Sequence, residues 1–205
     1  MENQQWYGQW GMVLIMVAIF GWLIFRFLKP QRKREWRNAG ILGAFLIALY
    51  TEMYGFPLTI YILTSIFGIN IPFTHFEGHL WSSLFGFGEG GAMTEMIIGD
   101  LVMVMGIVLV VAGWRKIYYA KDMLATDGIY KYMRHPQYAG IILITVGTLI
   151  HWPTLITILM WPILLIAYYY LAKKEEKEMA ARFGQIYQEY KNRVPMFFPL
   201  LKRSI

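Results

Sequence analysis

Three chemically capable side chains lie close together where the chain passes from a polar stretch into an apolar one. The stretch is GIYKYMRHPQYAG, residues 128–140, and it contains Arg134, His135 and Tyr138. Pro136 suits the first turn of a helix, where its missing N–H leaves no hydrogen bond unmade. His135 then lies at the helix cap, able to donate or accept a hydrogen bond toward a ligand. Tyr138, one turn later, adds an aromatic ring and a hydroxyl.

Two carboxylates from a distant stretch of sequence are expected at the same depth in the membrane. Glu175 and Glu176 follow the last apolar segment by a few residues, and His135 comes just before the preceding segment. Carboxylates accept hydrogen bonds from an amine or from ribose hydroxyls. The arrangement predicts a site for a polar, partly cationic small molecule at the cytoplasmic surface. The alternative is that Arg134 and His135 only anchor a helix to lipid headgroups.

The elements that position these residues are expected to be membrane helices. Of the 205 residues, 57% are hydrophobic and 16% are charged, whereas soluble domains average about 25% charged residues. A helical run of about 20 apolar residues crosses a hydrocarbon layer of roughly 30 Å. We therefore predict an all-α, polytopic membrane helical bundle. Its five membrane segments are expected at residues 10–28, 38–67, 93–114, 138–152 and 154–172.

Local sequence refines this prediction. YGFP, residues 54–57, is expected to kink or break the second segment. HWPT, residues 151–154, separates the last two segments, which are expected to form a helical hairpin with a short first arm. The tail, residues 173–199, is typical of a cytoplasmic amphipathic helix that ends before Pro195. Its expected apolar face consists of Met179, Phe183, Ile186 and Tyr190.

Basic residues predict the orientation. Five Lys or Arg residues lie in residues 29–37 and more follow the third segment, whereas residues 68–92 contain none. The positive-inside rule therefore places the basic loops and the C-terminus in the cytoplasm and the N-terminus outside. The net charge of +6 agrees with this topology and with anionic lipid headgroups, and it requires no nucleic acid. A signal peptide is the alternative for residues 10–28, but no basic residue precedes the run and no small-residue cleavage site follows it.

Other polar residues inside or between apolar segments have two interpretations each. Glu52 and Asp100 are either functional carboxyl groups or protonated structural ones. HFEGH, residues 75–79, contains His75, Glu77 and His79, but its spacing favours an interfacial polar loop over a metal site. GFGEGG, residues 86–91, follows no strand and is interpreted as a flexible connection. The absence of cysteine excludes disulfides and thiolate metal ligands, and we predict no metal site.

The motif around His135 resembles a known family signature. GIYKYMRHPQYAG and the tail block EEKEMAARFGQIYQEYKNRVP resemble the integral-membrane methyltransferases that include isoprenylcysteine carboxyl methyltransferase and the phospholipid N-methyltransferases. The two blocks cover about the last third of the chain. The resemblance implies S-adenosylmethionine as cofactor and a lipophilic or amphipathic acceptor that enters from the bilayer. It also implies one membrane domain over residues 1–205, with the substrate side in 1–118 and the cofactor-binding hairpin and tail in 119–205.

The resemblance assigns roles residue by residue. His135 and Tyr138 match the cofactor-contacting positions of the family motif, and Arg134 matches its arginine. Glu175 and Glu176 match the glutamate pair that closes the pocket, and Tyr130 in the same motif is also expected to contact the cofactor. Three residues are expected to act in catalysis: His135, Arg134 and Glu52. A carboxylate or thiolate acceptor needs no base, whereas an amine or hydroxyl needs one, which would be His135 or, further away in sequence, Glu52 or Asp100.

One departure from the family pattern concerns the acceptor. Prenylcysteine methyltransferases of animal type carry an arginine five residues before the second glutamate, where this chain has Leu171. This difference puts recognition of a prenylcysteine carboxylate in doubt. Two alternative functions are an NADPH-dependent membrane sterol or steroid reductase, for which few basic residues are present, and a non-enzymatic membrane scaffold.

Overall fold

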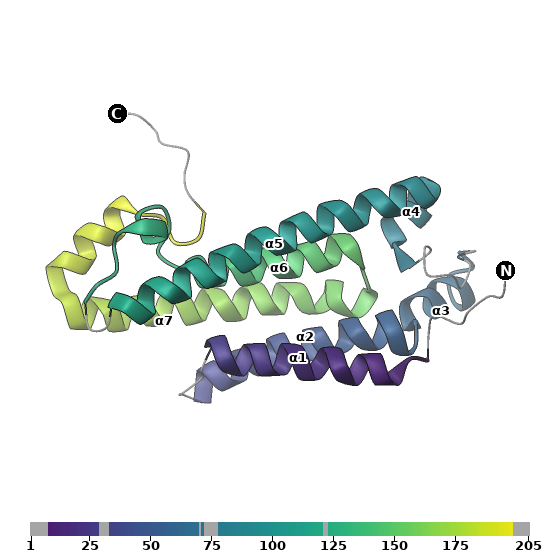
Figure 1. Ribbon diagram of the computed structural model, residues 1–205, viewed down its shortest axis with the longest axis horizontal. Coiled ribbons are helices and arrows are strands. Elements are labelled where there is room, and N and C mark those ends of the chain that lie inside the picture. The colour runs from purple at the N-terminus through teal and green to yellow at the C-terminus, as the bar shows by residue number, and fades with distance from the viewer. Residues whose placement is uncertain (1–7, 29–32, 70, 72–77, 121–122, 199–205) are drawn as a thin grey trace. The chain divides into compact units, whose positions relative to one another are not determined.

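The computed structural model describes the chain except for residues 1–7, 29–32, 70, 72–77, 121–122 and 199–205. All regular structure in the described residues is helical (Figure 1), which confirms the all-α class. The longer helices are α1 (Trp10–Leu28), α2 (Lys33–Tyr50), α3 (Leu58–Ser65), α5 (Gly88–Ala120), α6 (Pro136–His151) and α7 (Leu155–Arg193). A π-helical turn (Thr51–Gly55), the short helix α4 (Leu80–Phe85) and a 3-10 turn (Gly128–Lys131) complete the order.

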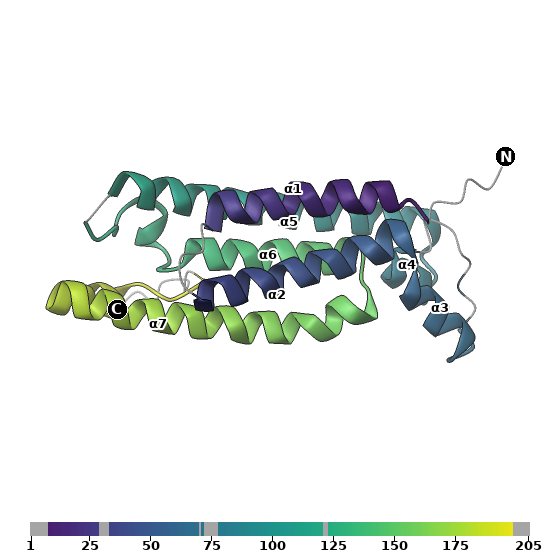
Figure 2. The ribbon, with the colours of Figure 1, turned by 90° about the horizontal axis from the view of Figure 1, so that it is seen from below.

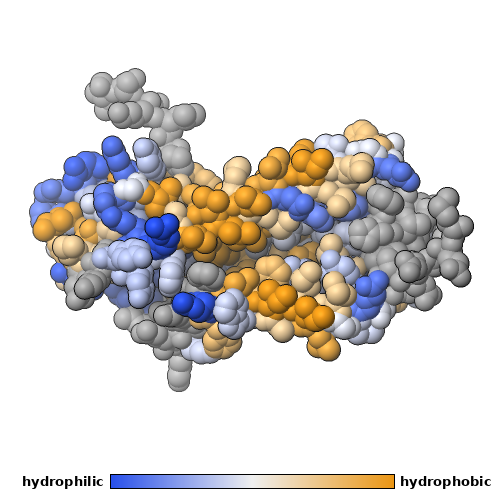
Figure 3. Space-filling model, viewed as in Figure 1, coloured by the Kyte–Doolittle hydropathy of each residue, from blue (hydrophilic) through white to orange (hydrophobic). Residues whose placement is uncertain are grey.

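Among the residues that the structure describes, two helices are long and apolar enough to cross a membrane. They are α5 and α7, and residues 36–65 provide a third candidate if the bent pair of helices there is counted as one span. The pair bends by 69° at a break before Leu58, because YGFP interrupts the helix as the sequence predicted. Exposed apolar side chains cover α5, whose surface in Figure 3 is largely hydrophobic. The chain is therefore an integral membrane protein, and the count of five membrane segments stays a prediction.

The chain divides into two compact units. Unit 1 contains residues 1–101 and 146–165, and unit 2 contains residues 102–145 and 166–205. In unit 1, α1 packs on α2 and on the π-helical turn, with the rings of Phe20 and Tyr50 stacked at 5.3 Å between centroids. Thr59 of α3 accepts a hydrogen bond from the N–H of Leu155, at a distance of 2.9 Å, which satisfies one free amide in the first turn of α7.

Two glycines bring α5 and α6 together in unit 2. A Cβ atom on Gly106 would lie 2.6 Å from the carbonyl oxygen of Gly140, and one on Gly140 would lie 2.5 Å from that of Gly106. Only glycine permits this approach, which is the way in which membrane helices pack closely. The beginning of α6 also lies beside α7 (Figures 1 and 2), and the rings of Tyr138 and Tyr168 are 5.3 Å apart. This packing brings the motif to the charged stretch of α7.

A kink at Gly184 redirects the end of α7. Gly184 has φ 54° and ψ −128°, a conformation that glycine adopts without steric penalty. Beyond it, Tyr187, Tyr190 and Val194 are buried and pack against Leu124, Met179, Ala180 and Phe183. The predicted apolar face was wrong at one position, since Ile186 is 67% exposed. The physical reason is that the kink breaks the helical register on which the prediction relied. The tail continues α7 as far as Gly184, and the residues beyond the kink form a second helical stretch.

Candidate functional site

Arg134 joins the start of α6 to the end of α7 within unit 2. Its Nε donates to Oε1 of Glu176 at 2.9 Å, and Nη2 donates to the same oxygen. Nη1 donates to the carbonyl oxygens of Lys191, at 2.8 Å, and Val194. A cation that satisfies the last carbonyl groups of a helix stabilises its C-terminal end. Arg134 therefore holds the redirected tail against the motif.

Glu176 is the buried centre of this charge network. Its side chain is 1% exposed and that of Arg134 is 9% exposed. Lys191 adds a second cation, with Nζ 3.0 Å from Oε2 of Glu176. A buried carboxylate is tolerated when cations and hydrogen bonds surround it, so Glu176 serves as an ionised partner for Arg134 and Lys191.

His135 lies between the two glutamates. Its Nδ1 is 3.5 Å from Oε2 of Glu175 and its Nε2 is 3.7 Å from Oε1 of Glu176. The ring stacks on Tyr138 at 5.6 Å with an interplanar angle of 9°. The backbone N–H groups of Arg134 and His135 donate at 2.9 Å to the carbonyl oxygens of Pro195 and Met196. The residues after α7 therefore fix the backbone that carries the histidine.

The protonation of His135 predicts a pH dependence of stability. Burial lowers the pKa of His135, but hydrogen bonds and charge interactions with Glu175 and Glu176 outweigh burial and raise the pKa above its ordinary value of 6.5. The folded protein binds this proton more tightly than the unfolded chain does. The stabilisation is therefore complete below about pH 6.5 and is lost as pH rises through the raised pKa.

Thermal unfolding in detergent between about pH 6 and pH 9 checks this expectation, because the window spans the titration of a raised histidine. We expect the wild-type melting temperature to fall as pH rises and the decline to be smaller in His135→Gln. The difference between the two slopes isolates this residue from other titrating groups. Equal slopes for the two proteins would show that His135 carries no such linkage.

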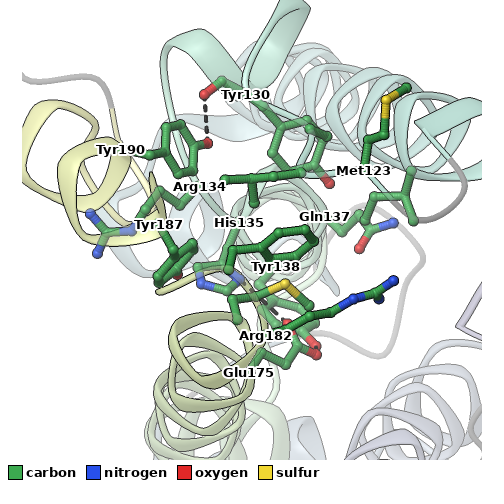
Figure 4. A pocket seen from close by; sticks show the side chains of 15 residues that line it. Met123, Tyr130, Arg134, His135, Gln137, Tyr138, Glu175, Arg182, Tyr187 and Tyr190 are labelled. Atoms are coloured by element: carbon green, nitrogen blue, oxygen red, sulfur yellow. Dashed lines mark hydrogen bonds and ion pairs between the residues drawn. The ribbon is translucent and has the colours of Figure 1, made fainter. Parts of the chain in front are cut away.

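A cavity of about 220 Å³ opens beside these residues (Figure 4). Its polar lining includes Glu175, His135, Gln137 and Arg182, while Glu176 does not line it. Tyr138 donates a hydrogen bond to Oε1 of Glu175 and so orients the carboxylate. The aromatic part of the lining consists of Tyr130, Tyr138, Phe183, Tyr187 and Tyr190. The aromatic side chains can therefore surround a flat ring of a ligand, while the carboxylate of Glu175 and the guanidinium of Arg182 can bind polar groups of the same ligand.

Tyr130 helps to close the cavity through its backbone. Its carbonyl oxygen accepts a hydrogen bond from the hydroxyl of Tyr190 at 2.7 Å, drawn in Figure 4. Its own hydroxyl donates to the carbonyl oxygen of Gly113 at 3.4 Å. The link ties the 3-10 turn to the redirected tail, so that residues from both ends of the site are held in one arrangement.

Most of the predicted site residues come together in unit 2. They are Tyr130, Arg134, His135, Tyr138, Glu175 and Glu176. Sequence reasoning gave the two glutamates one role, whereas the structure has Glu175 at the cavity and Glu176 beneath it. It missed Lys191 and Tyr187. The only sequence signal for these two was their helical spacing from the glutamates, which the kink at Gly184 makes uninformative.

Glu52 belongs to unit 1. It is 3% exposed in the π-helical turn, and its Oε2 accepts a hydrogen bond from the N–H of Thr59 at 2.8 Å. Asp100 is in the same unit, where its Oδ1 lies 2.9 Å from Nδ1 of His151. His75 and Glu77 lie outside the described residues, and the described part of the chain holds no group of acidic, histidine or cysteine residues suited to a metal ion.

Comparison with known proteins adds an independent line of evidence. Residues 92–181 match the model of the isoprenylcysteine carboxyl methyltransferase (ICMT) family. Protein-S-isoprenylcysteine O-methyltransferase B of Arabidopsis thaliana is 26% identical over 160 residues, which are 75% of this chain and 77% of the relative. Protein-S-isoprenylcysteine O-methyltransferase of Schizosaccharomyces pombe is 32% identical over 80 residues, 38% of this chain. The Xenopus laevis enzyme of that name is 32% identical over 87 residues, also 38% of this chain.

The chain spans only part of two of these relatives, 34% of the S. pombe protein and 28% of the X. laevis protein. The family match begins in α5 and runs to the charged stretch of α7, and it includes Arg134, His135, Glu175 and Glu176. The predicted resemblance to integral-membrane methyltransferases is thereby confirmed, and the methyl donor of that family is S-adenosylmethionine.

Proposed function

We propose that this chain, a relative of the isoprenylcysteine carboxyl methyltransferases, is itself an integral-membrane methyltransferase. It transfers a methyl group from S-adenosylmethionine to a lipophilic or amphipathic acceptor that enters from the bilayer. The observation that carries the proposal is the cavity beside the motif. There Glu175, His135 and Arg182 line one space together with several aromatic rings, within or next to the region that matches the family model.

The residues of the cavity fit the methyl donor chemically. S-adenosylmethionine carries an ammonium group, a carboxylate, a ribose diol and an adenine ring, and when bound it supplies an electrophilic methyl group. Glu175 suits the ammonium group or the diol, and Arg182 suits the carboxylate. Phe183 and Tyr187 offer aromatic faces for adenine. Tyr138 orients Glu175 through a hydrogen bond, and the backbone oxygen of Tyr130 holds Tyr190 of the tail.

The chain's own residues contribute mainly by positioning. Arg134 and Glu176 form a buried ion pair, and His135 lies against Glu176. Because the two glutamates raise the pKa of His135 and so favour its imidazolium form, the ring is better suited to donate a hydrogen bond than to accept a proton. An acceptor that is already ionised, such as a carboxylate, needs no base, so alignment in a fixed geometry is sufficient. This favours a carboxylate oxygen as the methylated atom, as in the relatives named O-methyltransferases.

Glu52 is proposed as the base only if the acceptor is an amine or a hydroxyl. Its Oε1 is buried and has no hydrogen-bond partner among the described residues, and buried carboxyl groups inside membrane segments commonly have a function. Under the carboxylate proposal Glu52 has no chemical role. Glu52→Gln, which preserves the shape of the side chain, separates the two cases through its effect on turnover.

We also propose the finer topology. The chain forms five membrane segments with a C-terminal hairpin and a cytoplasmic amphipathic tail, and its N-terminus lies outside. Epitope tags at the N-terminus and within residues 78–90 are expected to be labelled from outside intact cells. Tags at residue 33 and at the C-terminus are expected to be labelled only after permeabilisation, because the basic loops stay inside. A C-terminal tag labelled on intact cells would reverse the orientation.

A methyl-transfer assay tests the proposed function. Purified protein in vesicles made from lipids of the expressing cells, supplemented with N-acetyl-S-farnesylcysteine, receives S-adenosylmethionine labelled in the methyl group. We expect label in the organic phase, at a rate proportional to protein and abolished by excess S-adenosylhomocysteine. Mass spectrometry of the labelled fraction identifies the acceptor. Label that does not exceed the level of protein-free vesicles would refute the proposal.

A further inference from the structure

We propose that the hydroxyl of Tyr168 binds the polar head of the methyl acceptor. The inference rests on the proposed function and deepens it. Tyr168 is 1% exposed, and its hydroxyl is buried without a hydrogen-bond partner among the described residues. A buried hydroxyl that makes no hydrogen bond is destabilising. A native protein retains such a group when something outside the described chain satisfies it, and in an enzyme the substrate is one such partner.

The position of Tyr168 points to the acceptor and not to the methyl donor. Tyr168, Ala172, Glu175 and Met179 recur at helical spacing and lie on one side of α7. Glu175 and Met179 line the cavity. Tyr168 precedes Glu175 by seven residues, about 10 Å along the helix axis toward its apolar half. An acceptor that enters from the bilayer reaches this depth before it reaches the cavity.

Tyr168 is also connected to the cavity through one side chain. Its ring lies 5.3 Å from the ring of Tyr138, at an interplanar angle of 57°. Tyr138 in turn lines the cavity and donates to Glu175. Ala172, between Tyr168 and Glu175 on this side of the helix, is fully buried and small. Along this side of α7, from Glu175 toward the apolar half of the helix, the hydroxyl of Tyr168 is therefore the first polar group after the residues that line the cavity.

The chemistry of a phenol defines the class of acceptor. Leu171 and Ala172, the next buried residues along α7, are apolar, and Arg134 is already occupied by Glu176. The donor offered to the acceptor is therefore a neutral O–H group and not a cation. It suits an amphipathic molecule whose head presents a hydrogen-bond-accepting oxygen, from a carboxylate or a phosphate, beside an apolar tail.

Tyr168→Phe tests the inference, with Tyr169→Phe as the matched control. Both substitutions remove one oxygen from adjacent tyrosines, and Tyr169 is 43% exposed. We measure initial rates of methyl transfer over a dilution series of vesicles that contain N-acetyl-S-farnesylcysteine and phosphatidylethanolamine. Losing a hydrogen bond to a charged oxygen lowers kcat/KM for the acceptor about ten- to a hundredfold. Binding of S-adenosylhomocysteine is expected to stay at the wild-type value, because Tyr168 does not line the cavity. The melting temperature is expected to stay the same or to rise, because the substitution removes a buried hydroxyl that has no hydrogen-bond partner among the described residues.

Each outcome is decisive. If Tyr168→Phe methylates as fast as wild type, or loses no more than Tyr169→Phe, the inference is wrong while the proposed function stands. If the loss comes with weaker binding of S-adenosylhomocysteine, Tyr168 serves the donor and the inference also fails. If wild-type protein methylates nothing in these vesicles, the proposed function fails and the inference fails with it.

Discussion

Replacing Arg134 by methionine is expected to lower the free energy of unfolding by about 3–5 kcal/mol, the range for breaking one partner of a buried ion pair. The guanidinium is 9% exposed and Glu176 is 1% exposed, so the substitution leaves a carboxylate buried with one cation fewer. Because Lys191 still lies 3.0 Å from Glu176 and partly compensates its charge, we expect a loss at the lower end of that range. The carbonyl oxygens of Lys191 and Val194 also lose their donor. Unfolding by denaturant in detergent micelles measures the change.

Arg193→Met provides the control for this prediction. Arg193 also lies near the end of α7, but it is exposed, and its Nε donates to the backbone oxygen of Glu189 at 3.2 Å. Surface substitutions of this kind change stability by less than about 0.5 kcal/mol. Arg134→Lys is expected to recover part of the loss, because lysine keeps the charge and lacks the planar fork. Equal stabilities for Arg134→Met and Arg193→Met would contradict a structural role for the buried pair.

Removing either Glu175 or His135 is expected to weaken binding of S-adenosylhomocysteine about ten- to a hundredfold. A hydrogen bond that involves a charged group contributes about 1.5–3 kcal/mol, and both side chains line the cavity. The two residues lie 3.5 Å apart and share one ligand, so Glu175→Ala and His135→Ala combined are expected to lose less than the sum of the single effects. Isothermal titration calorimetry measures all three variants. Glu176 pairs with Arg134 and does not line the cavity, so its removal is expected to affect stability, as in the first prediction.

Glu178→Ala is the matched control for the binding experiment. Glu178 lies on the same charged turn of α7 but pairs with Lys174 at the surface, outside the cavity lining. Its removal is expected to leave the affinity unchanged. If Glu175→Ala bound S-adenosylhomocysteine like Glu178→Ala, the acidic turn would serve only as a solvated helix surface.

The sequence could predict that His135 and Glu175 lie near each other, because this depends only on the depth in the membrane at which each apolar segment begins or ends. His135 begins a helix and Glu175 follows an apolar run, and both boundaries are visible as changes in hydrophobicity. The same reasoning located the break at Tyr54–Pro57, because proline and glycine interrupt helices for local reasons. These parts of the structure follow from chemistry within a few residues of sequence.

The division of work between the glutamates could not be predicted. Which of Glu175 and Glu176 faces the cavity depends on the rotation of α7 against α6, and adjacent residues on a helix differ by about 100°. The role of Lys191 depends on the kink at Gly184, a single φ angle that turns the tail back over Arg134. Exposure of Ile186 and burial of Tyr187 have the same cause. The π-helical turn that contains Glu52 likewise had no sequence signal.

Calorimetric titration of purified wild-type protein with S-adenosylhomocysteine and, separately, with NADPH tests the central claim most directly. The account predicts saturable binding of S-adenosylhomocysteine at one site per chain and no heat with NADPH. The cavity offers a carboxylate to an ammonium group, which NADPH lacks, and Arg182 is the one guanidinium in its described lining that is not bound to Glu176 and could meet a phosphate. Binding of NADPH without binding of S-adenosylhomocysteine would contradict the account and favour a reductase.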